Sequence, residues 1–392
     1  MHCTITRARV QRHAAELLRT CLRLRDQSPT CTAGVLLHVL FTACSRLCSL
    51  SAACWSLATA PCRETIRQAT LKALKSRDDL LRRLNRALTA EVPRGLRRRP
   101  QQVAIDLVLV PYHGEPMADL KEVYRSQARS GTSHFHAYAT AYVNYRGQRF
   151  TLALAVVERG EKLQEVLKRL LGRLAALGVS TRMVLLDRGF WSVGVLGYLQ
   201  RARKPFLMPV VLRGRKPDHA EGPSGTRVFA MRKRGGWDRY TVKASDGQVA
   251  RVSICIHCRN YNGQWGRHGR QALVYAFWGF RPSNTRWVRE TYRKRFAIET
   301  SYRQMHQARA RTCTRNPLVR LLLVGVALVL RNVWAWLHYA VLSTPRRGNC
   351  RYNLDRLTLR TMLLWLQHQA EDELGHRDEV SCERPMPQRI GA

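Results

Sequence analysis

The order of apolar runs between residues 102 and 212 is the strongest constraint on how this chain folds. Strands are predicted where apolar residues alternate or run continuously, and helices where they recur every three to four residues. The predicted strands are 102–112, two strands within 134–160 that a tight "NYRG" turn joins, 181–190 and 204–212, and the predicted helices are 161–178 and 191–203. The resulting order, β-β-β-α-β-α-β, favours a mixed sheet whose faces are covered by helices.

This order is that of an α/β ribonuclease H-like core, and the rest of the chain divides around it. The predicted division is a helical N-terminal domain at 1–92, a basic linker at 93–101, the core at 102–343 with a β insertion at about 213–285, and a C-terminal helix with a polar tail at 344–392. Helical patterns return at about 286–313 and 317–343, so the insertion precedes the last helix of the core. We expect the tail to be disordered because it is polar.

Two short helical patterns lie between residues 50 and 75, separated near Ala60-Pro61. Thr65, Arg67 and Gln68 would face outward on the second of them. This pattern fits a helix-turn-helix, whose second helix enters a DNA major groove, and it fits an ordinary helical hairpin equally well.

Positive charge runs through the whole sequence and predicts a polyanionic partner. Lys and Arg number 67 against 27 Asp and Glu, a formal net charge of +40 with a pI near 11.1. Because such an excess repels itself unless something neutralises it, nucleic acid is the leading partner. The longest apolar run, 321–330, is too short to span a bilayer and indicates a buried helix, so no membrane partner is expected. The N-terminus has no apolar segment typical of a secretory signal.

The cysteines indicate small core residues in a reduced protein. Seven of the twelve lie within the first 62 residues, in helical patterns. Cys255 and Cys258, with His257 and His268 nearby, are a weak zinc candidate because no second Cys-x-x-Cys pair follows. Ordinary positions on paired strands are the better interpretation.

Three acids stand out by position. Asp106 lies in the middle of the first apolar strand, Asp187 ends the fourth, and Glu299 is the single acid among eight Lys or Arg between residues 291 and 320. A carboxylate in a buried strand is costly unless it binds a metal or an arginine. In the predicted sheet the first and fourth strands are neighbours, so the acids would converge and could hold two divalent cations.

Each acid also has an ordinary structural interpretation. Asp106 could be a satisfied core acid, and Asp187 could cap the following helix. Glu299 could pair with Arg295 or Arg303, at i−4 and i+4 on the same helix. The functional interpretation is favoured because all three acids occur together in this strand order.

The spacing of Tyr292, Arg295, Glu299 and position 306 resembles the Y-x2-R-x3-E-x6-K signature of DDE transposases of bacterial and archaeal insertion sequences. On a continuous helix these positions share one face. The stretches "AIDLVLVPYHG" and "LLDRGFW" look like the first and second aspartate motifs of this group, and other stretches resemble its branch described from halophilic archaea. One departure is His306, where the signature has lysine.

This resemblance implies cutting at the inverted ends of the protein's own mobile element and joining of the 3′-OH ends to target DNA. Asp106, Asp187 and Glu299 would be catalytic and would bind two Mg²⁺ or Mn²⁺ ions. The residues implied to contact DNA are Tyr292, Arg295, Arg303, His306 and, from the insertion, Trp237, Trp265, Arg267 and Arg270. Trp191 would stack on a flipped base or, as the favoured alternative, pack in the core.

The implied partner is double-stranded DNA, bound by a homodimer, in the cytoplasm of a bacterium or archaeon and associated with its nucleoid. Two other interpretations fit the same residues. One is a ribonuclease H-like nuclease without strand transfer, and the other is a transposase-derived DNA-binding protein that has lost cutting.

Overall fold

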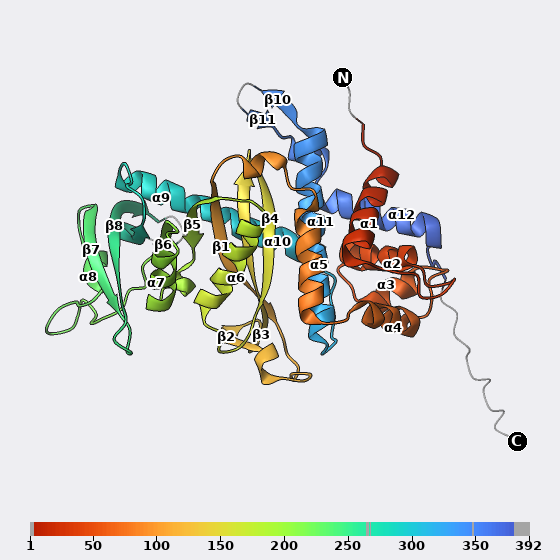
Figure 1. The fold of residues 1–392 in the computed structure, drawn as a ribbon, viewed down its shortest axis with the longest axis horizontal. Helices are drawn as coiled ribbons and strands as arrows, with labels where there is room; N and C mark the ends of the chain where they lie inside the picture. Colours follow the sequence, from red (N-terminus) through yellow and green to blue (C-terminus); the bar gives the residue numbers. More distant parts are fainter. Residues whose placement is uncertain (1–3, 264–265, 267, 347–348, 380–392) are drawn as a thin grey trace, which may run out of the picture.

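The computed structural model describes residues 4–263, 266, 268–346 and 349–379. Figure 1 shows an elongated molecule in three parts: a group of N-terminal helices at one end, a central sheet, and a smaller group of strands at the other end. The predicted helical N-terminal region and the predicted order of strands and helices between residues 102 and 212 are both present. The fold is therefore a mixed α/β sheet with helices.

The sheet joins strands from the core and from the insertion. In the described chain it has nine strands in the order β2-β3-β1-β5-β6-β9-β8-β7, with β4 paired to β3. Their bounds are β1 Gln101–Pro111, β2 Tyr124–Arg129, β3 Thr132–Tyr145, β4 Gln148–Val157, β5 Thr181–Leu186, β6 Phe206–Pro209, β7 Gly236–Lys243, β8 Val249–Asn262 and β9 His268–Trp278. Strand β1 is antiparallel to β3 and parallel to β5, and β5 is parallel to β6.

Most predicted strands are present close to their expected bounds, and β2 is a short strand that the apolar pattern did not predict because its residues are largely exposed. The "NYRG" turn between β3 and β4 has the left-handed backbone that such hairpins require, with φ of 50° at Arg146 and 85° at Gly147. The helices between the parallel strands are α6 (Leu163–Ala176) and α7 (Val193–Arg201).

The insertion extends the central sheet and does not form a separate one. Strand β9 pairs antiparallel with β6, with Phe206 opposite Trp278, and β8 and β7 follow outward. The Cys255 and Cys258 positions lie on β8, where Cys255 is fully buried opposite Tyr275. Cys258 likewise faces a residue of β9, Ala272, so both cysteines occupy positions on paired strands.

The N-terminal helices pack with the C-terminal one. Five helices precede the sheet: α1 (Arg7–Leu22), α2 (Ala33–Arg46), α3 (Leu50–Ser56), α4 (Arg63–Ala73) and α5 (Arg77–Ala90). Helix α12 (Leu359–Leu374) packs mainly against α1 and α2 and also contacts α10 and α11. Helices α3 and α4 are the two halves of the helix-turn-helix candidate; Arg67 and Gln68 are exposed there, and both donate to Glu64.

Helix α11 (Pro317–Leu337) is the central helix of the core. Asn316 caps its first turn by accepting from the N–H groups of Leu318 and Val319, and Pro317 occupies the first position, where no N–H is needed. Its extension to Leu342 is apolar and long enough to cross a bilayer, but 94% of the apolar window is buried inside the protein. That degree of burial is typical of a core helix in a folded domain.

Two buried asparagine side chains form hydrogen bonds with backbone groups on the edge of β4 that has no neighbouring strand. Asn85 of α5 accepts from the Leu154 N–H and donates to the Leu154 carbonyl oxygen, at 2.8 and 2.9 Å. Asn332 of α11 makes the same pair of bonds with Thr151, at 3.0 and 2.7 Å. Because each side-chain amide offers both donors and an acceptor, it replaces the neighbouring strand that β4 lacks on this edge.

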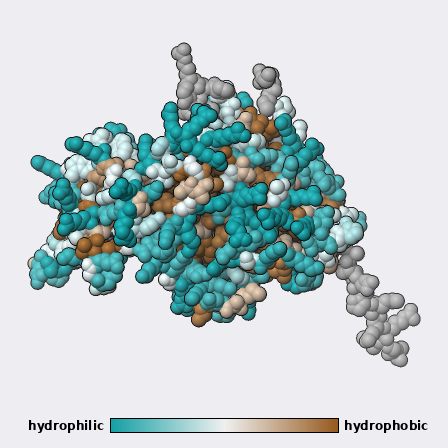
Figure 2. Space-filling model, in the orientation of Figure 1, coloured by the Kyte–Doolittle hydropathy of each residue, from teal (hydrophilic) through white to brown (hydrophobic). Residues whose placement is uncertain are grey.

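The surface agrees with the composition. Figure 2 shows that this face of the molecule is mostly hydrophilic, with apolar residues in small separate areas. Recognition at such a surface depends on charge more than on apolar docking.

Candidate active site

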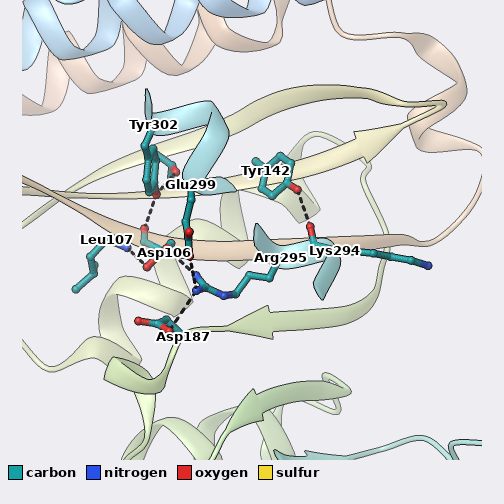
Figure 3. A network of polar contacts seen from close by, with 9 residues as sticks. Asp106, Leu107, Tyr142, Asp187, Lys294, Arg295, Glu299 and Tyr302 are labelled. Carbon is teal, nitrogen blue, oxygen red and sulfur yellow. Dashed lines mark hydrogen bonds and ion pairs between the residues drawn. The ribbon is translucent and has the colours of Figure 1, made fainter. Parts of the chain in front are cut away.

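The three predicted acids come together on one face of the sheet. Asp106 lies on β1 opposite Thr140 of β3, Asp187 directly follows β5, and Glu299 lies in the first turn of α10 (Ala297–Ala308). Strands β1 and β5 are parallel neighbours, with Ile105 paired to Leu186, so their acids lie side by side. Helix α10 brings the third acid to the same place from a distant part of the sequence (Figure 3).

A single guanidinium lies between the three carboxylates. Arg295 Nη1 donates to Asp106 Oδ2 at 2.7 Å, and Arg295 Nη2 lies 3.3 Å from both Asp187 Oδ1 and Glu299 Oε1. The Arg295 side chain is only 5% exposed, and its Nε is buried without a hydrogen-bond partner within the described residues. Three acids against one cation leave the cluster with two negative charges when all of the groups are ionised.

The three carboxylates differ in how firmly they are held. Asp106 is 15% exposed and also accepts from the Leu107 N–H, whereas the side chains of Asp187 and Glu299 are 43% and 50% exposed. The Asp106 carboxylate is therefore held in one orientation, whereas the carboxylates of Asp187 and Glu299 have room to rotate.

Burial dominates the electrostatics of the site. It raises the pKa of Asp106 to about 6; the charge of Arg295 lowers this pKa, and that of Asp187 raises it. Burial also opposes the Arg295 cation, but Tyr292, Asp106 and Asp187 more than offset it, so the pKa of Arg295 is raised. Arg295 therefore stays charged, and Asp106 is ionised near neutral pH.

Two residues that the sequence analysis did not single out hold the helix against the strands. The Tyr302 hydroxyl of α10 donates to the Asp106 carbonyl oxygen at 3.0 Å and lies 2.7 Å from Thr140 Oγ1. The Tyr142 hydroxyl of β3 donates to the carbonyl oxygen of Lys294 at 3.1 Å. Tyr302 is three residues after Glu299 on the same helix, and this spacing was the available sequence signal.

The segment carrying the signature is not one continuous helix, and this corrects the sequence expectation for 286–313. Helix α9 (Thr285–Arg293) is followed by a 3₁₀ turn, Lys294–Phe296, before α10 begins. Arg295 sits on this turn, where the change in helical geometry lets it reach Asp106 across the sheet face. His306, two turns beyond Glu299, forms no part of the ionic cluster.

The structure places the other predicted DNA contacts in different environments. Tyr292 is 4% exposed and packs on Tyr275 and the Arg295 guanidinium, so neither Tyr292 nor Arg295 presents a free surface to a phosphate in this conformation. Arg303 and His306 are exposed on α10. Partial burial of the His306 ring, followed by the charge of Arg309, lowers its pKa, and the ring is neutral near pH 7.

Trp191 is buried in the main apolar core, at 5% exposure. The core-packing interpretation therefore describes it, because a buried indole offers no face for a base. In the insertion, Trp237 is 45% exposed, and Arg270 donates to the Lys233 carbonyl oxygen at 3.0 Å. Trp265 and Arg267 lie outside the described residues.

Within the described residues no group of three His, Cys, Asp or Glu side chains, these acids included, is so placed that it could hold a metal ion, but the chemistry of the three donors fits a hard divalent cation. Carboxylate oxygens are the ligands that Mg²⁺ and Mn²⁺ prefer, and the two half-exposed carboxylates can turn toward a cation next to the fixed Asp106. Arg295 now satisfies the same oxygens, so a bound cation would have to share them with the guanidinium or displace it. Asp106, Asp187 and Glu299 are the residues that would hold the metal.

Comparison with known proteins gives one family match. The family model for the transposase DDE domain matches residues 97–331, which include all three acids. A solved structure, the cryo-EM structure of a piggyBac transposase synaptic complex with hairpin DNA, is similar at a TM-score of 0.49 and 12% identity, covering 93% of this chain and 78% of that one. No curated protein matches the sequence.

Proposed function

Because this chain belongs to the transposase DDE domain family, we propose that it cuts the inverted ends of its own insertion sequence and joins the freed 3′-OH ends to target DNA. The observation that carries the proposal is the convergence of Asp106, Asp187 and Glu299 from three elements onto one point. The Arg295–Glu299 ion pair that the sequence allowed as an ordinary alternative is present, but one arginine cannot neutralise three carboxylates, so ion pairing alone does not account for all three acids.

The residues of the chain have separate roles in this proposal. Asp106, held by the Leu107 N–H and by the Tyr302 contact to its own carbonyl oxygen, is the rigid ligand. Asp187 and Glu299 complete the ligand set by rotating from Arg295 toward the cations. Two Mg²⁺ or Mn²⁺ ions, when bound, would activate the attacking hydroxyl and stabilise charge on the leaving oxygen at phosphorus.

Release of the carboxylates changes what Arg295 can bind. Its guanidinium has five donors, and once the acids turn to a cation those donors face the same pocket without partners. A forked guanidinium matches the oxygens of a DNA phosphate as it matches those of a carboxylate. Arg295 would thus hold the acids together and neutralise them before substrate binds, and would orient the phosphate afterwards.

The architecture we propose is a ribonuclease H-like core that includes β1, β3, β4, β5, β6 and the helices α6, α7 and α10. Two copies would hold the two element ends together, and Arg303 and His306 would contact double-stranded DNA from the exposed face of α10. The insertion would contact the element ends through Trp237. The expected setting is the nucleoid in the cytoplasm of a bacterium or archaeon.

The test is cleavage and joining of DNA that carries the inverted ends flanking the coding sequence, with Mg²⁺ or Mn²⁺. We expect wild-type protein to release 3′-OH ends and to form joined product. Glu299→Gln keeps the size of the side chain but removes a charged ligand, so we expect it to bind the same DNA and to lose at least about 10² in cleavage rate, as removal of one key electrostatic group typically does. Gel-resolved single-turnover kinetics measures both.

The control is Glu290→Gln on α9, an exposed acid whose carboxylate pairs with Arg286 and takes no part in the cluster. It should cleave as the wild type does. Cutting without joined product would identify a nuclease of the same fold, and DNA binding without cutting by wild type under either metal would identify a DNA-binding relic.

A further inference from the structure

A cavity lies on the same sheet face as the acids and next to them along the strands. It has a volume of about 240 Å³ and is lined by Gln102, Ala104, Tyr142, Asn144, Leu185 and Lys294. The first five of these residues belong to β1, β3 and β5, and Lys294 belongs to the 3₁₀ turn that also carries Arg295. The cavity is therefore enclosed by the same strands and the same turn that build the acidic site.

The strand register places this cavity beside Asp106. Ala104 pairs with Tyr142 of β3 on one side and with Leu185 of β5 on the other. Side chains alternate between the two faces of a sheet, so Ala104 and Gln102 share the face of Asp106. They precede it by two and four residues, which correspond to about 7 and 13 Å along the strand. The small Ala104 side chain leaves room between its two larger neighbours.

The polar groups around the cavity are mainly donors, and no acid is among the described residues that line it. Gln102 Nε2 is buried and has no hydrogen-bond partner within the described part of the chain. Asn144 Oδ1 accepts from the Gly147 N–H at 3.1 Å, so the amide nitrogen is the end that Asn144 can offer to a ligand. Lys294 is exposed, and Figure 3 shows its side chain extending away from the three acids.

The turn that carries Lys294 is held over the cavity. The Tyr142 hydroxyl donates to the Lys294 carbonyl oxygen at 3.1 Å, and Arg295 is fixed by its contacts with the acids. The cation of Lys294 and the amides of the strands are therefore brought to one space by ordered backbone on both sides.

A ligand that only accepts hydrogen bonds suits this set of donors. A phosphate offers acceptor oxygens and negative charge, whereas the nucleobases carry donors as well as acceptors. Lys, Asn and Gln side chains are among the groups that contact DNA phosphates. An unsatisfied buried donor such as Gln102 Nε2 costs free energy, and a turn of this side chain toward a phosphate oxygen would recover it.

We propose that Gln102, Asn144 and Lys294 form a positioning site for a backbone phosphate of the DNA strand, close to the scissile phosphate at the acids. The proposal rests on the proposed function, because it takes the acids as the point of cleavage. Gln102 and Asn144 would donate from the sheet and Lys294 from the turn. Holding this phosphate would set which phosphate of the strand reaches Asp106.

The test is a scan in which single phosphates of a duplex that carries the element end are replaced by uncharged methylphosphonates. Fluorescence anisotropy without divalent metal measures binding by wild type and Lys294→Gln. We expect one replacement close to the cleavage point to weaken wild-type binding about tenfold and to weaken Lys294→Gln binding much less. Lys294→Gln should also lower the slope of log K against log salt by about 0.9, the value for one lost phosphate contact.

Two control variants match these changes in charge. Lys168→Gln removes an exposed lysine of α6 that pairs with Glu165, and its scan should equal that of wild type. Gln102→Glu places a negative charge at the cavity, so it should weaken DNA binding more than Gln127→Glu, at an exposed position on β2, which pairs with the other end of β3. If Gln102→Glu does not fold, the exposed Lys294→Gln still decides the test.

Equal methylphosphonate effects in wild type and Lys294→Gln at every position, with circular dichroism showing native folding, would overturn the phosphate site. A cost of removing one base that Gln102→Glu abolishes, without any methylphosphonate effect, would assign the cavity to a nucleobase and also overturn it. A Tm increase with inorganic phosphate that Lys294→Gln abolishes, together with unchanged DNA binding, would assign the site to free phosphate and overturn the DNA assignment.

The two proposals fail separately. If wild type cleaves and joins DNA but the scan is the same for Lys294→Gln, the phosphate site is wrong and the transposase proposal stands. If the scan differs as expected but wild type never cleaves, the phosphate site stands on a DNA-binding protein and the catalytic proposal is wrong.

Discussion

At the scale of single residues, Arg295 decides how the site works. The sequence analysis assigned it to a DNA phosphate, and the structure places its guanidinium among three carboxylates, where it is nearly inaccessible. The expected phosphate contact and the observed carboxylate contacts are compatible if Arg295 neutralises the acids until metal cations bind them. Three neighbouring acids, of which Asp106 is largely buried, would repel one another without a counter-charge, so we expect a cation beside them both before and after metal binding.

We predict that Arg295→Gln binds Mn²⁺ about tenfold or more tightly than wild type in the absence of DNA, which corresponds to about 1.4 kcal/mol or more. Removal of the guanidinium takes away a cation that competes for the same oxygens. Isothermal titration with Mn²⁺ measures the change, and Arg303→Gln, exposed on the same helix, is the control. Weaker Mn²⁺ binding by Arg295→Gln would mean that the arginine positions the carboxylates and does not compete with the metal.

At the scale of elements, the edge of β4 shows how helices replace a missing strand. Asn85 and Asn332 come from different helices, and each bonds to both the N–H and the carbonyl oxygen of one β4 residue. Asn332 also donates to the Leu88 carbonyl oxygen at 2.9 Å, so it joins α11, α5 and β4 at one point. This contact fixes where the central helix lies along the sheet.

We predict that Asn332→Leu lowers the free energy of unfolding by about 2–4 kcal/mol, since it leaves the buried Thr151 N–H and carbonyl groups without partners. Thermal and urea unfolding measure the change. Asn262→Leu, at an exposed position at the end of β8, should change stability by no more than about 0.5 kcal/mol. An Asn332→Leu protein as stable as wild type would show that water or a shifted side chain satisfies the strand edge.

At the scale of the whole molecule, the chain is built around one main core. Buried residues from Val10 in α1 to Leu374 in α12 belong to a single connected apolar cluster that includes α11 and most of the central sheet. Helix α12 packs on α1 and α2 at the end of the molecule that holds the N-terminal helices (Figure 1). The first and last parts of the sequence therefore depend on each other for burial.

We predict that Leu366→Ala, at a fully buried position on α12, lowers the Tm of the sheet as well as that of the N-terminal helices. A buried leucine truncated to alanine typically costs about 2–5 kcal/mol, and a shared core transmits that loss to both parts. Differential scanning calorimetry should show one shifted transition. The exposed His368→Ala on the same helix should leave it in place. Two transitions of which only one moves would show that the parts fold independently.

The sequence by itself determined the order of strands and helices, the strand position of Asp106, the strand-end position of Asp187 and the helical position of Glu299. These follow from local patterns, because apolar periodicity depends on neighbouring residues and an acid interrupting such a pattern is visible without coordinates. The charge of the chain likewise follows from composition alone.

Only the tertiary structure decided which groups meet. The break at Lys294–Phe296, the central place of Arg295, the union of the insertion with the main sheet and the packing of α12 on α1 all depend on contacts between distant segments. Local propensity favours a continuous helix over the signature residues, and burial of one guanidinium among three carboxylates outweighs it. For Trp191 the sequence left base stacking open beside the favoured core packing, and its burial agrees with core packing.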